Sequence, residues 1–459
     1  MYIFDGAMGT MLQAAGLEEG YCPELFNIER PEVVKDIHAQ YLQHGSDVIT
    51  TNTFGACGLK LEDYDLQDRV REINIAAVKV AKEAIAEVKP SARVAGSMGP
   101  TGRFLQPLGN MSFDSIYDTY REQAEALIEG GVDFIIIETI IDVQEMRAAL
   151  LASLDAREAA GKTKDDVQII CQFSFSEDGR TITGTPPAVA TTIVEAMGAD
   201  IIGINCSLGP EQITPLIEEI ASVTNLPISC QPNAGMPQLI NKQTVFPLTA
   251  EEMGPLMLPI VDAGASYVGG CCGTTPDHIH AMVELTKDIP VQMPEKKHRT
   301  VISSYSQAVV FDKKTIIIGE RINPTGKSKF KQALRDHNLE YILREGVTQQ
   351  DNGADVLDVN VGLPEIDEPS MMEDVVKELQ AVIDLPLQLD TSSAEAMERG
   401  LRVYNGKPLI NSVNGKKEVM EQIFPLVAKY GGVVVGLCLD EDGIPETAEG
   451  RIAVGKKII

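Results

Sequence analysis

Three cysteines next to apolar segments are the residues of this chain best suited to chemistry. Cys271 and Cys272 stand side by side in a glycine-rich turn after a short apolar run, and Cys206 follows the apolar run 201–204. Structural zinc normally takes four protein ligands, whereas catalytic zinc takes three and leaves a position for water or substrate. Because no further cysteine or histidine pair completes a set of four, the sequence predicts an open zinc site at Cys206, Cys271 and Cys272.

Two other interpretations of these cysteines stay open at the level of sequence. Free cysteine often packs as a small buried apolar residue, in which case the three would have no chemical role. Adjacent cysteines can also form a disulfide, although such a bond would be strained and is disfavoured in a reducing cytosol. Since packing rarely requires two adjacent cysteines, zinc is the favoured interpretation.

The overall composition excludes several classes of protein. The 459 residues carry 67 acidic and 39 basic side chains, a formal net charge of −28. Such a chain repels phosphate backbones and anionic membranes, so we expect neither nucleic acid nor a membrane among its partners. The N-terminus lacks the pattern of a signal peptide, and no apolar run approaches the ~20 residues that span a bilayer. We therefore expect a cytoplasmic protein.

Short apolar runs alternate with amphipathic stretches along the first part of the chain, which is the pattern of a parallel β/α fold. Eight such strand–helix units within a segment close to the ~250 residues of a typical barrel predict a closed (β/α)8 TIM barrel over residues 1–289. The expected strands are Tyr2–Asp5, Asp47–Thr51, Arg93–Ser97, Phe134–Glu138, Gln168–Phe173, Ile201–Asn205, Ile228–Gln231 and Tyr267–Gly270.

Barrels of this type carry their chemistry at the C-terminal ends of the strands. The sequence places polar or cysteine residues there: Asp5, Asn52, Glu138, Asn205, Cys206, Asn233, Cys271 and Cys272. All eight strand ends open on one face. The three cysteines can therefore converge although they are far apart in sequence.

A second alternating series follows a linker predicted over residues 290–310. Its expected strands are Thr315–Ile318, Val356–Asn360, Leu387–Asp390, Leu409–Ser412 and Gly432–Leu439. Five strands cannot close an eight-stranded barrel, and an open sheet would leave an unpaired parallel edge. We therefore interpret residues 311–459 as the N-terminal part of a second (β/α) barrel, incomplete because the sequence is a fragment of a longer chain.

Five ordered motifs of the first segment resemble the homocysteine S-methyltransferase family over roughly residues 1–290. They are Asp5-Gly6-Ala7-Met8-Gly9-Thr10, Thr51-Asn52-Thr53-Phe54, Gly203-Ile204-Asn205-Cys206-Ser207, Pro232-Asn233-Ala234-Gly235 and Gly270-Cys271-Cys272-Gly273. One such motif could arise by chance, but five in order are highly specific.

The second segment resembles a pterin-binding methyltransferase barrel. The motifs are Gly319-Glu320-Arg321-Ile322-Asn323-Pro324-Thr325-Gly326, Asp358-Val359-Asn360, Asp390-Thr391 and Asn411-Ser412. This tandem order is similar to the N-terminal half of the cobalamin-dependent methionine synthases. The chain departs from that family because it ends inside the second barrel and lacks the cobalamin and reactivation domains.

The resemblance implies roles for the residues of the first barrel. Cys206, Cys271 and Cys272 would hold zinc, and the sulfur of L-homocysteine would fill the open position. Asp5 and Glu138 would bind the amino group of homocysteine, and backbone N–H groups of the turn Gly6–Thr10 would bind its carboxylate.

The residues of the first barrel also allow simpler interpretations. Asp5-Gly6 can be an ordinary turn, and Glu138, after the apolar run 134–137, can belong to a buried ion pair. Asn205 and Asn233 could line the pocket or occupy the fourth zinc position when homocysteine is absent, but each could also cap a loop.

In the second barrel the resemblance assigns a cluster at successive strand ends to 5-methyltetrahydrofolate. These residues are Glu320, Asn323, Asp358, Asn360, Asp390 and Asn411. Carboxylates and amides match the donor and acceptor edge of a pterin, although Asp358 and Asn360 can also be ordinary polar residues of a barrel.

The expected function is therefore zinc-dependent transfer of a methyl group to L-homocysteine, which gives L-methionine. Methylcobalamin, carried by a domain or corrinoid protein outside this sequence, would be the donor, and 5-methyltetrahydrofolate the methyl source. One alternative is a homocysteine methyltransferase that uses betaine or S-methylmethionine, against which the pterin-like segment argues. Another is a zinc- or thiol-binding module of a corrinoid complex without catalysis.

Overall fold

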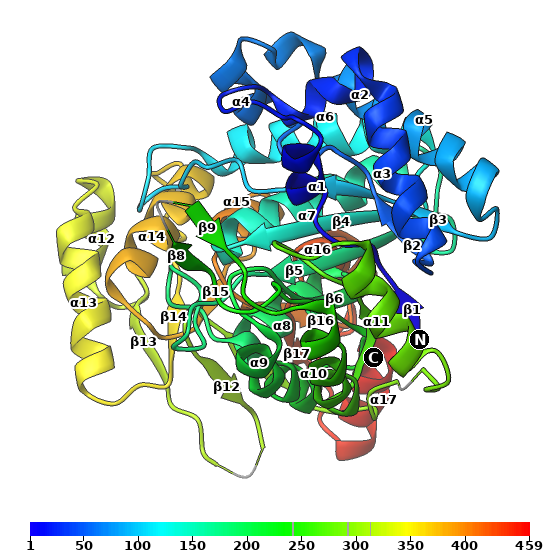
Figure 1. Cartoon of the computed structure of the whole chain (residues 1–459). Helices are drawn as coiled ribbons and strands as arrows, with labels where there is room; N and C mark the ends of the chain where they lie inside the picture. The colour runs from blue at the N-terminus through cyan, green and yellow to red at the C-terminus, as the bar shows by residue number, and fades with distance from the viewer. Residues whose placement is uncertain (241–242, 292, 313) are drawn as a thin grey trace. The chain divides into compact units, whose positions relative to one another are not determined.

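The computed structural model describes residues 1–240, 243–291, 293–312 and 314–459. These residues form two compact units (Figure 1). The first comprises residues 1–105, 111–195 and 199–297, and the second comprises residues 106–110, 196–198 and 298–459. No helix among the described residues is long and apolar enough to cross a membrane.

The first unit is built on an eight-stranded parallel sheet in the order β1-β10-β7-β6-β5-β4-β3-β2. A parallel bridge between Phe4 and Val48 joins the two ends of this order, so the sheet closes on itself. The strands are β1 (Tyr2–Ile3), β2 (Val48–Thr50), β3 (Arg93–Met98), β4 (Phe134–Ile140), β5 (Gln168–Phe173), β6 (Ile201–Asn205), β7 (Ile228–Gln231) and β10 (Ala265–Val268). The predicted TIM barrel is confirmed.

Helices follow the strands, and most of the longer ones are amphipathic, whereas α7 is buried on nearly all sides. They are α1 (Met8–Ala14), α2 (Phe26–Glu29), α3 (Pro31–Gln43), α4 (Gly58–Leu61), α5 (Val70–Val88), α6 (Phe113–Gly130), α7 (Val143–Ala159), α8 (Pro187–Met197), α9 (Pro210–Val223), α10 (Ala250–Asp262) and α11 (Pro276–Thr286). Helix α3 shows how sequence sets these bounds. Pro31 occupies its first position, where a missing N–H costs nothing, and Gly45 beyond its end has a φ of 106°, which favours glycine.

Side chains fill the inside of the barrel, so it is a packed core and not a channel. A cluster of inward-facing residues joins strands from around the barrel: Phe4, Val48, Ala95, Phe134, Ile136, Ile170, Ile201 and Tyr267. The rings of Tyr2 and Tyr267 stack at 4.8 Å between centroids, which ties the first strand to the last. Burial of this apolar surface holds the strand ends in fixed positions.

A short antiparallel hairpin, β8 (Gln238–Ile240) and β9 (Gln243–Val245), interrupts the alternation after β7. The sequence pattern does not predict this hairpin, because each strand has only three residues. Phe246, which follows the hairpin, packs so closely on Gly273 that a Cβ there would lie 2.3 Å from the Cβ of Phe246. The hairpin is thereby anchored beside the turn that carries Cys271 and Cys272.

The second unit contains a five-stranded parallel sheet in the order β13-β14-β15-β16-β17. Its strands are β13 (Ile318–Ile322), β14 (Val356–Val359), β15 (Leu387–Asp390), β16 (Leu409–Asn414) and β17 (Val433–Leu437), and its helices are α12 (Ser328–Arg335), α13 (Leu339–Asp351), α14 (Glu368–Val382), α15 (Ala394–Val403), α16 (Lys417–Tyr430) and α17 (Ala448–Ile458). Sequential order of parallel strands with intervening helices is the arrangement of consecutive units in a (β/α) barrel.

The first predicted strand of this unit, Thr315–Ile318, was wrong. The observed β13 begins at Ile318 and pairs with β14 through Gly319 and Ile322. Three of its five residues are exposed, so it lacks the continuous apolar run by which buried parallel strands are recognised. The apolar run just before it led to the misplacement.

Residues 290–310, expected to be a linker, contain a second antiparallel hairpin, β11 (Val301–Ser303) and β12 (Ala308–Val310). Gln292 within this segment lies outside the described residues. Ser303 exchanges two backbone hydrogen bonds with Lys407, at 2.9 and 3.0 Å, so the hairpin is attached to the second unit.

Candidate active site

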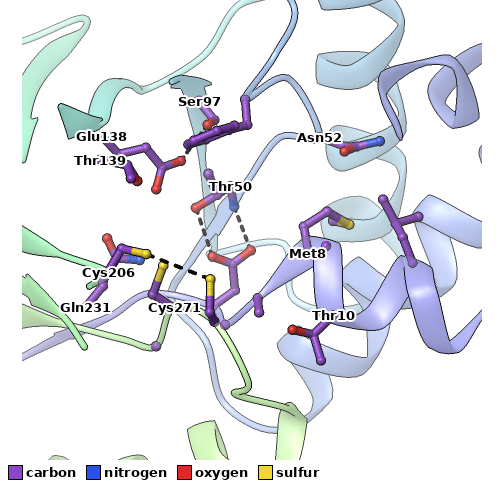
Figure 2. A pocket seen from close by; sticks show the side chains of 18 of the residues that line it. Met8, Thr10, Thr50, Asn52, Ser97, Glu138, Thr139, Cys206, Gln231 and Cys271 are labelled. Carbon is purple, nitrogen blue, oxygen red and sulfur yellow. Dashed lines mark hydrogen bonds between the residues drawn. The ribbon is translucent and has the colours of Figure 1, made fainter. Parts of the chain in front are cut away.

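The three predicted zinc ligands lie together at the C-terminal ends of β6 and β10. The sulfur atoms of Cys206, Cys271 and Cys272 are all within 4.8 Å of one another, and those of Cys206 and Cys272 are 3.8 Å apart. Figure 2 shows the sulfur atoms of Cys206 and Cys271 side by side at the cavity. Cys206 has a φ of 60°, an unusual value for a residue other than glycine, and this turns its side chain toward the pair from β10.

The backbone that follows β7 holds the two cysteine loops in place. Four hydrogen bonds connect it to them, namely Cys206 N–H to Gln231 O (3.1 Å), Asn233 N–H to Leu208 O (3.0 Å), Cys271 N–H to Pro232 O (2.8 Å) and Ala234 N–H to Cys272 O (2.9 Å). Strand β7 lies between β6 and β10 in the sheet. Segment 231–234 therefore fixes the distance between the cysteine loops on its two sides.

The three thiols affect one another's protonation. Hydrogen bonds from Cys271 and Cys272 lower the pKa of Cys206. The bond to Cys206 in turn raises the pKa of Cys272 to about 12, and that of Cys271 also rises. One thiolate is thus stabilised by two thiols, and full deprotonation of all three requires a cation among them. Three thiolates with nitrogen- and oxygen-bearing side chains nearby form a donor set that suits zinc.

Two buried carboxylates stand beside the sulfur atoms. Asp5, two residues after the end of β1, accepts hydrogen bonds from the N–H and the hydroxyl of Thr50, both at 2.8 Å. Glu138, in β4, accepts from the hydroxyl of Ser97 at 2.5 Å and from the amide of Asn205 at 3.1 Å. Burial raises the pKa of Asp5 and of Glu138 to about 7 each. Among the described residues neither carboxylate has a cationic partner, and a bound ammonium group would supply one.

These groups share a cavity of about 280 Å³. It is lined by Asp5, Gly6, Ala7, Met8, Gly9, Thr10, Leu12, Pro23, Glu24, Thr50, Thr51, Asn52, Phe54, Ser97, Glu138, Thr139, Cys206, Gln231, Gly270, Cys271 and Cys272. The turn Gly6–Thr10 leads into α1, and the first N–H groups of a helix have no partner within the helix. The cavity therefore combines thiols and carboxylates (Figure 2) with the backbone donors at the start of α1.

The two asparagines expected near the pocket take different positions, and neither lines the cavity. The side chain of Asn205 is bonded to Glu138 and to the backbone N–H of Thr139, at 3.1 and 2.7 Å. Thr139 has a φ of 62°, so Asn205 stabilises an unusual turn beside Glu138. Asn233 hydrogen-bonds Cys206 and lowers the pKa of that thiol, while its side-chain oxygen is buried without a hydrogen-bond partner among the described residues.

Several residues of the cavity were not anticipated from the sequence. Thr50, Ser97 and Thr139 stand at or near strand ends like the predicted residues, but their side chains are uncharged and gave no chemical signal. Glu24 comes from a short 3-10 helix after α1, Pro23–Leu25, and accepts a hydrogen bond from the N–H of Gly55 at 2.7 Å. Thr50, Ser97 and Thr139 could have been predicted from their positions at strand ends, whereas nothing in the sequence pattern indicates Glu24.

The residues predicted for folate occupy neighbouring strands of the second unit. Asn360 donates to Asp390 at 3.0 Å, and Asp390 is paired in register with Asn411. Asp358 is buried and accepts from Gln388 and from Asn323, and burial raises its pKa to about 6.

Glu320 lies in the middle of β13 and forms an ion pair with Lys327 at 2.9 Å. Four of the six residues, Asn323, Asp358, Asn360 and Asp390, lie at or next to the C-terminal ends of their strands, whereas Glu320 and Asn411 lie farther back along theirs.

Comparison with known proteins identifies the class to which the fold and the site belong. Residues 2–286 match the model of the homocysteine S-methyltransferase family, and residues 319–452 match that of pterin-binding enzymes. Because the first match covers more than half of the sequence, the chain belongs to the homocysteine S-methyltransferase family.

Among its relatives are two proteins described as methionine synthase, from Mycobacterium tuberculosis and Mycobacterium leprae. Each is 33% identical to this chain, and the match covers 99% of this chain. The chain spans 39% of the length of each of these relatives.

Solved structures agree with the fold of the first unit. The homocysteine methyltransferase MmuM from Escherichia coli superimposes with a TM-score of 0.52 in its metallated form and 0.51 in its oxidized form. Identity is 24%, and the match covers 61% and 62% of this chain and 95% of MmuM. At this identity the likeness establishes the fold of the barrel.

Proposed function

We propose that this chain transfers a methyl group to the thiolate of L-homocysteine, giving L-methionine. The observation that carries the proposal is a single cavity lined by three clustered thiols, two buried carboxylates and the free N–H groups at the start of α1. An amino acid with a thiol at the end of its side chain complements each of these groups. Membership in the homocysteine S-methyltransferase family supports the same substrate.

Different residues would bind different groups of the substrate. Asp5 and Glu138 would bind the α-ammonium group, whose charge replaces the protons that burial otherwise keeps on these carboxylates. The N–H groups of Met8, Gly9 and Thr10 would bind the α-carboxylate, since negative charge is favoured at the start of a helix. The substrate is thereby oriented with its sulfur toward the cysteines.

Cys206, Cys271 and Cys272 would hold a zinc ion. Zinc bound by three thiolates keeps one position open and maintains a ligand thiol as a nucleophilic thiolate at neutral pH, where a free alkyl thiol is only a few per cent ionised. The unpartnered, buried oxygen of Asn233 fits a fourth ligand for the ion when homocysteine is absent.

For the methyl donor we propose methylcobalamin carried by another domain or protein, with 5-methyltetrahydrofolate as the methyl source. The pterin-binding match over residues 319–452 and the relatives described as methionine synthase favour this donor over betaine or S-methylmethionine. The polar row of Asn360, Asp390 and Asn411, with Asp358 and Asn323 beside it, would bind the pterin ring.

The first experiment is elemental analysis of the chain purified under reducing conditions, followed by methyl-transfer assays with each donor. We expect about one zinc per chain, as for other open catalytic sites, and methionine formation from homocysteine and methylcobalamin. Absence of zinc with free thiols and failed remetallation contradicts the zinc site. Activity with betaine but none with methylcobalamin contradicts the donor, and zinc binding without turnover on any donor favours a non-catalytic module.

A further inference from the structure

Thr274, three residues after Cys271, connects the metal-ligand turn to the turn that would bind the amino acid. Its hydroxyl donates to the carbonyl of Cys271 at 2.6 Å and accepts from the N–H of Ala7 at 3.1 Å. The side chain is fully buried. One hydroxyl therefore joins the turn after β10 to the turn after β1, which are 267 residues apart in sequence.

Tyr41, on α3, supports the same junction from outside the barrel. Its fully buried hydroxyl donates to the carbonyl of Ala7 at 3.1 Å and lies 3.4 Å from the carbonyl of Thr274. A third connection runs from the N–H of Gly273 to the hydroxyl of Thr10, at 3.2 Å. The two turns are thus joined by side-chain hydroxyls at three points.

The packing around the Thr274 hydroxyl leaves no room for adjustment. A Cβ on Gly6 would lie 2.6 Å from this oxygen and 3.0 Å from the hydroxyl of Tyr41, and a Cβ on Gly270 would lie 2.5 Å from the Thr274 oxygen. Glycine at both positions lets the two turns approach the hydroxyl directly. The hydroxyl contacts are not needed to close the barrel, because the N–H of Gly270 already donates to the carbonyl of Asp5 at 3.0 Å.

We infer that Thr274 and Tyr41 are positioning residues that hold the cysteine turn and the amino-acid-binding turn in one fixed register. This inference rests on the proposed function, since it assigns zinc to the first turn and the α-carboxylate to the second. A homocysteine molecule must span both turns, with its carboxylate on one and its sulfur on the other. A change in the distance between the two turns would weaken the binding of the carboxylate and of the sulfur at the same time.

The test compares zinc affinity and amino-acid affinity in the full chain. Zinc affinity is measured by competition with a chelator, and binding of L-homocysteine and of L-norleucine to the zinc-loaded chain is measured by titration calorimetry. Norleucine has the ammonium and carboxylate groups but no thiol, so it reports the amino-acid turn separately from the metal.

In Thr274→Val, which keeps the shape and removes the hydroxyl, we expect zinc affinity and norleucine affinity each to fall about tenfold, as for loss of a buried hydrogen-bond pair. Thr274→Ser should retain the wild-type zinc affinity and norleucine affinity, because serine keeps the hydroxyl. Thr286→Val is the matched control: Thr286 is equally buried, bonds only a carbonyl within α11 at 2.8 Å, and should leave both affinities unchanged.

The inference is overturned if Thr274→Val alters only zinc affinity, only amino-acid affinity or neither, or if Thr286→Val has the same effect. Tyr41→Phe, which keeps the ring in its packing, gives a second test if Thr274→Val does not fold, and it should lower norleucine affinity in the same direction. A wild-type chain that binds neither zinc nor homocysteine overturns the proposed function and this inference together. A wild-type chain that binds both, with unaffected variants, overturns the inference alone.

Discussion

Replacement of Glu138 by glutamine removes the negative charge that this carboxylate carries when it is ionised, and changes the volume of the side chain very little. Glu138 is held by the hydroxyl of Ser97 and the amide of Asn205, which donate to its two oxygens and leave the remaining lone pairs for a ligand. In Glu138→Gln the ammonium group of homocysteine would lose the charged acceptor that we propose for it. Hydrogen bonds to charged groups contribute about 1.5–3 kcal/mol, which corresponds to an affinity about 10- to 150-fold weaker.

The assay is calorimetric titration of the zinc-loaded variant with L-homocysteine, together with zinc analysis. We expect the weaker affinity with zinc content unchanged, because Glu138 is not among the clustered sulfur ligands. Glu145→Gln is the matched control. Glu145 is also a buried carboxylate held by hydroxyl donors, Thr101 at 2.6 Å and Tyr120 at 2.9 Å, but it does not line the cavity.

Two results would refute the assignment of Glu138. One is homocysteine affinity within about threefold of the wild type, which is less than 1 kcal/mol and too small for a charged contact. The other is an equal loss in Glu145→Gln, which would show that any buried carboxylate of the barrel affects binding through the fold. Loss of zinc from Glu138→Gln would place its role at the metal instead of the substrate.

Three further perturbations test other parts of the structure. Cys272→Ser should lose most zinc affinity and nearly all homocysteine methylation, measured by chelator competition and methionine formation, with the far-ultraviolet circular dichroism unchanged; retained activity would contradict its role as a ligand. Gly203→Ala should destabilise the barrel by about 4 kcal/mol or more, measured by urea unfolding, because its Cβ would lie 1.9 Å from the carbonyl of Ser229 in the next strand; a normal midpoint would contradict this packing. His38 is fully buried, and burial lowers its pKa to about 4. As pH falls from ~6.5 toward 4, the unfolded chain therefore binds a proton at this histidine that the folded chain does not. Up to about 3 kcal/mol of the stability present above pH ~6.5 is lost in that window. The difference in unfolding free energy between wild type and His38→Leu should show this loss, and parallel pH profiles would contradict it.

The convergence of the cysteines could be predicted because it follows from topology. Once eight strand–helix units are recognised, all C-terminal strand ends lie on one face, and Cys206 and the pair Cys271–Cys272 must be near one another. The same argument placed Asp5 and Glu138 at the cavity. Backbone pairing imposes these positions, so no knowledge of side-chain packing was needed.

The features that could not be predicted from the sequence depend mainly on contacts between residues far apart in the chain. The amide of Asn205 donates to Glu138 and accepts from the N–H of Thr139, and both partners are 66 or more residues away in the sequence. The hydroxyl of Thr274 is one of many threonine hydroxyls, and only its contact with Ala7 distinguishes it. The start of β13 was misplaced because an exposed strand has no apolar pattern.

The meeting of the first and last strands has a consequence for how the protein acquires its site. Asp5 follows the first strand, Cys271 and Cys272 follow the last, and contacts between such distant segments form slowly because a long loop of chain must close. A nascent barrel that lacks its final strand holds one thiol of the three and no junction at Ala7. If the three cysteines hold zinc as proposed, tight metal binding would become possible only when the last strand has docked, and zinc uptake followed during refolding would time the closure of the barrel.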